Sequence, residues 1–117
     1  MKKLIILPFL FLLLVGCTTN GVDNSLYKDG KEIIQMTNDN VKSGTMQYSD
    51  SQQMKVDNFK SNYLGKKMND KDGRFLGDVE MAILAYMSYG SNQDDQYLTK
   101  FHQYLNKLKE NYNMSVD

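Results

Sequence analysis

The chain has few side chains that could do chemistry. It holds one Cys, Cys17, and one His, His102, so spacing alone cannot assemble a nucleophile with its base and orienting group. Paired acids, which can act as general acid and base, occur at Asp94–Asp95 and at Asp78 with Glu80. Both pairs fall near expected helix starts, where acids stabilise the helix dipole. The sequence therefore predicts no catalytic residue and no cofactor.

Residues 69–74, NDKDGR, have the alternating polar residues and the Gly of a calcium-binding loop. With this Gly at the sixth loop position, Asp70 and Asp72 occupy two ligand positions. Met68 then stands where the first Asp belongs, and Val79 stands where the bidentate Glu belongs. Because two essential ligands are missing, the sequence predicts a polar connection between helices here and no metal site.

Cys17 follows a strongly apolar start of the chain. Residues 1–16 contain two lysines directly after Met1, no acidic residue and an apolar run over residues 4–15 that only one Pro interrupts. A positive start followed by a short apolar run is typical of a secretory signal peptide. The run is shorter than the ~20 apolar residues that a membrane-spanning helix needs.

Residues 14–17, Leu-Val-Gly-Cys, resemble the lipobox of bacterial membrane lipoproteins: Leu, a small or aliphatic residue, Gly or Ala, then Cys. The resemblance covers residues 1–17 only. It implies that the thiol of Cys17 carries a diacylglyceryl group and that the signal peptide is cleaved between Gly16 and Cys17. Two acyl chains anchor a protein stably, at about 0.8 kcal/mol per buried CH₂. The predicted location is the extracytoplasmic face of the cell membrane, with the protein anchored there by lipid.

Composition excludes several classes of protein. Basic and acidic side chains both number 14, so the formal net charge is zero. A nucleic-acid-binding protein would show a basic excess, and we therefore expect no nucleic-acid partner. A single Cys excludes an internal disulfide framework and a zinc site built from several thiolates.

The length of 117 residues allows one folded domain. We expect a signal peptide over residues 1–16, the lipidated Cys with a polar tether over 17–27, and a small helical domain over 28–117. Glycines and polar turns separate four helical patterns in this last part, and Pro is absent from it, which favours helices over a turn-rich sandwich. The predicted fold class is all-α, a small bundle of about four helices.

The two C-terminal patterns are the clearest. Apolar residues at spacings of three and four predict a last helix. Ser91 with Asp94 is expected to cap its start, and His102 is expected at the edge of its apolar face. The preceding helix is expected over about 73–89, with Gly90 as its C-terminal stop. The apolar face of the last helix contains Tyr97, Phe101, Tyr104, Leu105, Leu108 and Tyr112.

The two N-terminal patterns are weaker. Asp29 with Glu32 predicts one helix start and Ser49 with Gln52 predicts another, and each helix is expected to end at the next glycine beyond its apolar residues. Apolar residues are sparse over residues 18–72, so Tyr and Met must fill part of the core. We expect a firm C-terminal helix pair and a looser N-terminal half.

The sequence contains eight Tyr and eight Met, residue types that suit binding surfaces. Tyr48, Tyr89 and Tyr112 lie near the ends of helical patterns and are the predicted surface contacts. We expect a membrane-tethered binding or interaction module that engages a protein or peptide at the cell surface. Its small size and membrane location resemble those of exclusion and immunity lipoproteins, which suggests a role of that type. The alternative is a cell-envelope enzyme or a carbohydrate-binding accessory lipoprotein that stacks sugars on Tyr.

Overall fold

The structure, a computed structural model, describes residues 18–117. The signal peptide and the predicted lipid-attachment residue Cys17 lie outside the described residues. Within residues 18–117, the elements follow the order β1 (Thr18–Thr19), β2 (Val22–Asp23), α2 (Asn24–Lys42), α3 (Asp50–Tyr63), α4 (Asp70–Asn92) and α5 (Asp95–Tyr112). The predicted all-α bundle of four helices is therefore confirmed for this part of the chain.

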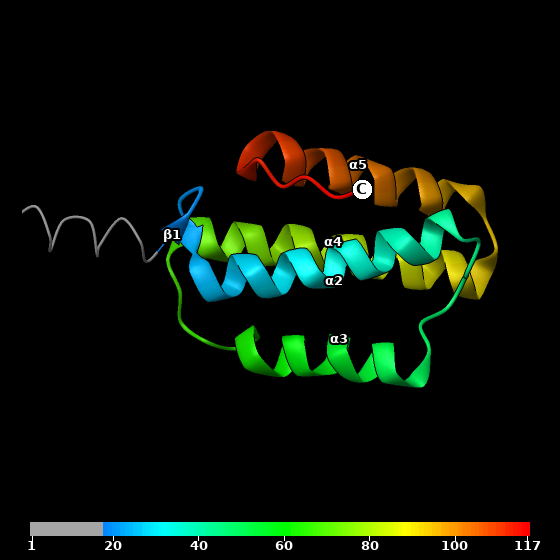
Figure 1. The fold of residues 1–117 in the computed structure, drawn as a ribbon, viewed down its shortest axis with the longest axis horizontal. Helices are drawn as coiled ribbons and strands as arrows, with labels where there is room; N and C mark the ends of the chain where they lie inside the picture. The colour runs from blue at the N-terminus through cyan, green and yellow to red at the C-terminus, as the bar shows by residue number, and fades with distance from the viewer. Residues whose placement is uncertain (1–17) are drawn as a thin grey trace, which may run out of the picture.

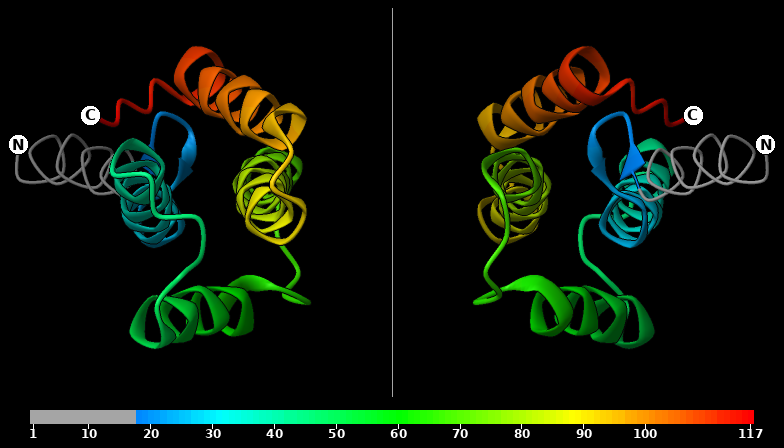
Figure 2. Two further views of the ribbon diagram at one scale, coloured as in Figure 1. Left: turned by 90° about the vertical axis from the view of Figure 1, so that its right-hand side faces the viewer. Right: turned by 90° about the vertical axis from the view of Figure 1, so that its left-hand side faces the viewer.

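The helices run alternately up and down the bundle (Figure 1). Helices α2 and α4 lie side by side, α5 lies along α4, and α3 lies on the side of the α2–α4 pair that faces away from α5 (Figure 2). The contact between α4 and α5 is the most extensive in the described chain, whereas α3 contacts mainly α2. The bundle thus consists of a three-helix body with α3 added to one side.

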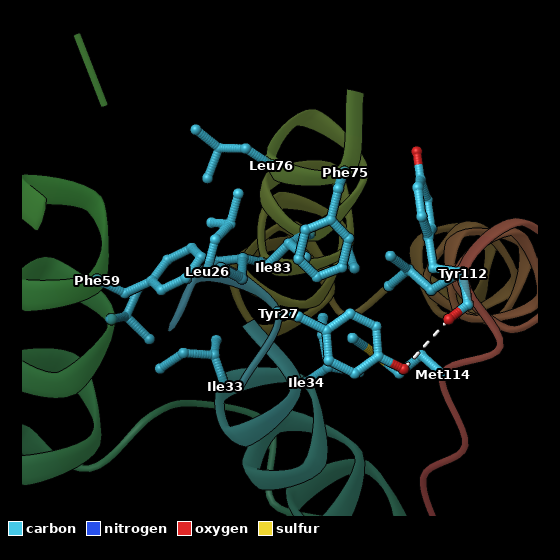
Figure 3. Packing of buried hydrophobic residues seen from close by; sticks show 14 of the residues in the cluster. Leu26, Tyr27, Ile33, Ile34, Phe59, Phe75, Leu76, Ile83, Tyr112 and Met114 are labelled. Carbon is cyan, nitrogen blue, oxygen red and sulfur yellow. Dashed lines mark hydrogen bonds between the residues drawn. The ribbon is translucent and has the colours of Figure 1, made fainter. Parts of the chain in front are cut away.

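The core lies between α2, α4 and α5 (Figure 3). Phe75 stands at its centre, stacked on Tyr27 with ring centroids 5.6 Å apart and edge-on to Tyr112 at 5.1 Å. Gly30 faces this ring so closely that a Cβ there would lie 3.0 Å from two of its carbon atoms. The missing side chain lets α2 approach α4 at this point.

The predicted tether over 17–27 is wrong for the residues that the structure describes. Residues 18–23 form the β1–β2 hairpin, and α2 begins at Asn24, before the predicted start at Asp29. Its N-cap is Asp23, whose carboxylate accepts a hydrogen bond from the backbone N–H of Leu26. Three apolar side chains of the supposed tether are buried in the core: Val22, Leu26 and Tyr27.

The start of α3 is as predicted. Ser49 Oγ accepts from the backbone N–H of Gln52 at 3.2 Å, and Gln52 Oε1 accepts from the backbone N–H of Ser49 at 3.0 Å, so the capping box is complete. The polar connection expected over residues 69–74 is instead the cap and first turn of α4. Asn69 is the N-cap, and its side chain accepts from the backbone N–H of Asp72.

The predicted boundary between the last two helices is wrong in two respects. Gly90 does not stop a helix but lies inside α4, which ends at Gln93 in the left-handed conformation with φ 55°. Asp94 alone, and not Ser91, caps α5, because its carboxylate accepts from the backbone N–H of Gln96 at 3.0 Å.

Candidate binding groove between α2 and α3

A groove of about 800 Å³ runs between α2 and α3. Ile33, Met36 and Phe59 supply its apolar surface. The amide side chains that line it are Gln35, Asn40, Gln52, Asn58 and Asn62. Its charged residues are Lys28, Asp29, Lys31, Glu32, Asp39 and Lys55, three cations and three anions.

The groove exists because α3 has a narrow apolar face. Only Val56 and Phe59 of this helix are buried, whereas Met54 faces solvent with 65 % of its surface exposed. A helix with a broad apolar stripe would bury it along its whole length against its neighbours. Helix α3 buries side chains fully only near its middle, and the half-buried Tyr63 packs on the core at its end. Much of its remaining inner surface borders the groove.

Polar side chains hold the two ends of α3. At its start, Asn40 and Gln52 exchange two hydrogen bonds between their amides, at 2.9 and 3.1 Å. At its end, Tyr63 Oη donates to Asp29 Oδ2 at 2.5 Å. Burial raises the pKa of the Tyr63 hydroxyl, and its hydrogen bond to Asp29 raises it further, so the hydroxyl stays protonated and remains a donor. These end contacts fix α3 in place and leave the groove open between them.

A buried polar cluster fixes the connection that leads into α3. Asn40 Nδ2 also donates to Tyr86 Oη at 3.1 Å, and Tyr86 Oη donates to the carbonyl of Thr45 at 2.8 Å. The hydroxyls of Tyr48 and Thr37 lie 2.7 Å apart, and the Tyr48 ring packs on that of Tyr86. Burial raises the pKa of both tyrosines. The cluster therefore ties the α2–α3 connection to α4.

The structure does not bring the three predicted contact tyrosines together. Tyr112 is only 5 % exposed, so the prediction that it lies on the surface is wrong. Its ring packs edge-on against Phe75 of α4, and its carbonyl accepts from Tyr27 Oη at 3.2 Å. Tyr48 is half-buried with its hydroxyl bonded internally, and Tyr89 is half-buried near the end of α4.

The acidic pairs have separate local environments. Asp94 is a helix cap, and Asp78 lies 4.0 Å from the ammonium of Lys107. Glu80 is half-buried, and its Oε1 has no hydrogen-bond partner among residues 18–117. Burial raises the pKa of Glu80, and the positive charge of Lys60 partly opposes this.

The described residues show no cluster of metal-binding side chains. His102 is exposed on α5, with its ring beside that of Phe101. In the range 18–117, no three or more His, Cys, Asp or Glu side chains are grouped so that they could hold a metal ion. The amide side chains of the groove can donate and accept hydrogen bonds, and its apolar surface can hold a small hydrophobic side chain. This arrangement is suited to binding a polypeptide segment.

Sequence reasoning missed the groove. One signal was present: Asn58 and Asn62 stand four residues apart on α3, and Gln35 and Asp39 stand four apart on α2, so each helix presents a polar stripe. The fact that these stripes border a common channel depends on the spacing of the two helices, which local sequence does not encode.

Comparison with known proteins yields no relative. No protein-family model, no curated protein and no solved structure matches this chain. None of the helices in residues 18–117 has both the length and the apolar character required to cross a bilayer. The features that indicate a function are therefore the geometry of the groove and the N-terminal sequence.

Proposed function

We propose that this protein is a small lipoprotein, held by Cys17 at the extracytoplasmic face of the cell membrane, that binds a protein or peptide segment in the α2–α3 groove. The groove is the observation that carries the proposal. It combines an apolar surface with amide side chains along an open channel, and recognition sites for extended segments need both.

Amide side chains support a peptide ligand. Asn58 and Asn62 each offer a carbonyl oxygen and an NH₂ group, the same acceptor and donor types that a peptide backbone must satisfy. The half-buried Met36 then provides the apolar contact for one hydrophobic side chain of the ligand. Charges of both signs at the edges favour a ligand of mixed charge.

The carbohydrate alternative has less support. Sugar stacking needs the open face of an aromatic ring, and the one ring that lines the groove, Phe59, is only 4 % exposed. None of the tyrosines lines the groove. We therefore favour a peptide ligand, and exclusion or immunity towards an incoming protein is one role that such a module would serve.

Membrane tethering makes a modest interface sufficient. A lipid anchor confines the protein to a thin layer, so its effective concentration towards a neighbour at the same membrane rises without any new contact. A groove of this size with few apolar residues then suffices for binding in the cell, although the free domain would bind weakly.

The groove is tested by two substitutions of one residue type. Met36 lines the groove, whereas Met54 points to solvent from α3. After peptides are selected from a random library on the wild-type protein, Met36→Glu should weaken their binding at least tenfold, about 1.4 kcal/mol. Met54→Glu should bind as the wild type does. Failure to select any peptide, or equal binding by both variants, would contradict the proposal.

The anchor is tested separately in cells. Labelled fatty acid should enter the wild-type protein, and Cys17→Ser should abolish the labelling and leave an uncleaved precursor. Release of the wild-type protein into the medium without lipid would overturn this part of the proposal.

The enzyme alternative is tested with the acidic pair at the start of α5. Asp94→Asn with Asp95→Asn should leave the cellular phenotype intact, whereas Cys17→Ser should remove it. Turnover of a substrate by the released domain, with these acids essential, would favour the envelope enzyme.

A further inference from the structure

The hairpin and the connection between α3 and α4 lie at the same end of the bundle (Figure 1). The backbone N–H of Asp23 donates to Asp72 Oδ1 at 3.1 Å, which ties the hairpin to the first turn of α4. The Lys71 side chain also covers Gly21. Thr18 begins this hairpin, and Cys17 directly precedes it in the sequence. Any lipid on Cys17 is therefore attached at this end.

The connection over residues 64–69, LGKKMN, has an amphipathic composition with one sign of charge. Leu64 is 47 % exposed, a large fraction for an aliphatic side chain, and Lys66 and Lys67 are exposed beside it. Met68 packs against the core and holds the connection to the bundle. The segment contains no acidic residue. An exposed aliphatic side chain next to lysines is suited to the interface of an anionic bilayer.

The opposite end of the bundle has the opposite charge. The connection between α4 and α5 contains Asp94 and is followed directly by Asp95, and α3 begins there with Asp50. At the hairpin end, Asp70 and Asp72 follow the 64–69 connection, but over residues 64–74 four basic side chains outnumber these two acids. An anionic surface therefore attracts this end and repels the acids at the opposite end. The charge difference and the position of Thr18 therefore both favour an orientation in which the hairpin end of the bundle faces the membrane.

We infer that residues 64–69 rest on the anionic bilayer that carries the anchor, with Leu64 among the headgroups and Lys66 and Lys67 facing lipid phosphates. The long axis of the bundle then rises from the membrane, and the α2–α3 groove runs away from it. This inference depends on the anchor of the proposed function but not on what the groove binds.

The expected size of the effect follows from the two lysines. One Lys near an anionic membrane changes partition about fivefold. The attraction decays over about 8 Å at physiological salt, so it should weaken strongly when salt is added. Insertion of Leu64 adds an apolar contribution that salt does not weaken.

Tryptophan fluorescence can test the orientation, because the chain contains no Trp. The full lipidated chain with Leu64→Trp is placed in vesicles of phosphatidylcholine alone or with added phosphatidylglycerol, together with lipids brominated near the headgroup. Met54→Trp is the matched control: this position is also exposed, and it lies on α3, about 15 Å along the helix axis from the C-cap residue Leu64. Bromolipid should quench the Trp at position 64 but not that at 54, and phosphatidylglycerol should increase the quenching.

Charge variants complete the test. Lys66→Gln with Lys67→Gln should reduce the phosphatidylglycerol-dependent quenching at position 64, whereas Lys42→Gln with Lys100→Gln, which removes the same charge at exposed sites elsewhere, should not. Protein that floats with the vesicles but shows equal quenching at 64 and 54 overturns this inference alone. Protein that does not float with them overturns the anchor and this inference together.

Discussion

Helices α3 and α5 both flank the central α2–α4 pair, but different forces hold them. Helix α5 buries Phe101, Leu108 and Tyr112 along one face. Helix α3 buries two side chains near its middle and is otherwise held by polar contacts near its ends. A continuous apolar face joins a helix to its neighbours along its length, whereas contacts at a few points leave a channel beside it.

The difference has consequences for dynamics as well as shape. A fully buried large apolar side chain contributes about 1.5–3 kcal/mol, whereas a hydrogen bond contributes about 1 kcal/mol net. Helix α3 is therefore expected to separate from the body at a lower free energy than α5. The same weakness suits a binding groove, because the helix can adjust to a ligand at little cost.

The same substitution in the two helices gives the largest predicted effect. Phe101→Ala in α5 should cost about 3–5 kcal/mol, close to the whole stability of a marginal domain. Phe59→Ala in α3 should cost about 2 kcal/mol, because this ring borders the groove and its neighbours can relax into it. Urea unfolding of a soluble chain beginning at Thr18 measures both. Equal costs would show that α3 is packed as firmly as α5.

Two glycines inside α4 provide a second comparison. A Cβ at Gly90 would collide with the backbone carbonyl of Met46 in the α2–α3 connection, so Gly90→Ala should destabilise the domain by about 1–3 kcal/mol. A Cβ at Gly77 would meet nothing within 4 Å, so Gly77→Ala should stabilise it by about 1 kcal/mol through helix propensity. Thermal melts of the two variants should therefore shift in opposite directions. If both melting temperatures shifted in the same direction, the α2–α3 connection would have to lie further from α4 than the structure shows.

Tyr63→Phe tests the polar contact at the end of α3. Loss of the hydrogen bond to Asp29 should cost about 1 kcal/mol. The effect should be local: amide hydrogen exchange should speed up in α3 and stay unchanged in α4 and α5. Faster exchange throughout the bundle would mean that α3 and the body unfold as one unit.

Glu80→Gln gives the smallest predicted effect. The folded-state pKa of Glu80 is raised above its usual 4.5 by burial, so the folded protein binds more protons than the unfolded chain, and stability falls as pH rises through this range. The variant should therefore be more stable than the wild type near neutral pH, and the gain should shrink below pH 4.5. A less stable Glu80→Gln at neutral pH would mean that attraction to Lys60 outweighs burial.

Local signals in the sequence were accurate where the structure depends on local contacts. The capping box of Ser49 with Gln52 formed as predicted, because both partners lie within one turn. The apolar face of α5 was also identified, since Phe101 and Leu108 are buried, although Leu105 is only half-buried. The spacing of Asp29 and Glu32 resembles a helix cap by chance, and it led to a predicted start of α2 that is later than the observed cap at Asp23. Val22 and Tyr27 stand at the positions of a hydrophobic staple, the signal that would have placed it.

Tertiary contacts decided the features that sequence did not predict. Gly90 would end many helices, but here its missing side chain makes room for the backbone of Met46, more than forty residues earlier. Tyr112 lies at a helix end, where exposure is expected, yet its ring is buried edge-on against Phe75 of α4. The groove likewise depends on where α3 lies relative to α2. Each of these features requires the three-dimensional arrangement of distant segments.

The hydrogen bond from Tyr27 Oη to the carbonyl of Tyr112 joins residues 85 positions apart, and the main chain of Asp117 bonds the side chains of Gln35 and Asn38. Helix α2 also packs on α4 and α3, which follow it much earlier in the sequence. The bonds to Tyr112 and Asp117 close the longest loops among these contacts, and loop closure costs more entropy as the loop lengthens. During folding, the segment after α5 is therefore expected to dock on α2 after α2 has packed against α4.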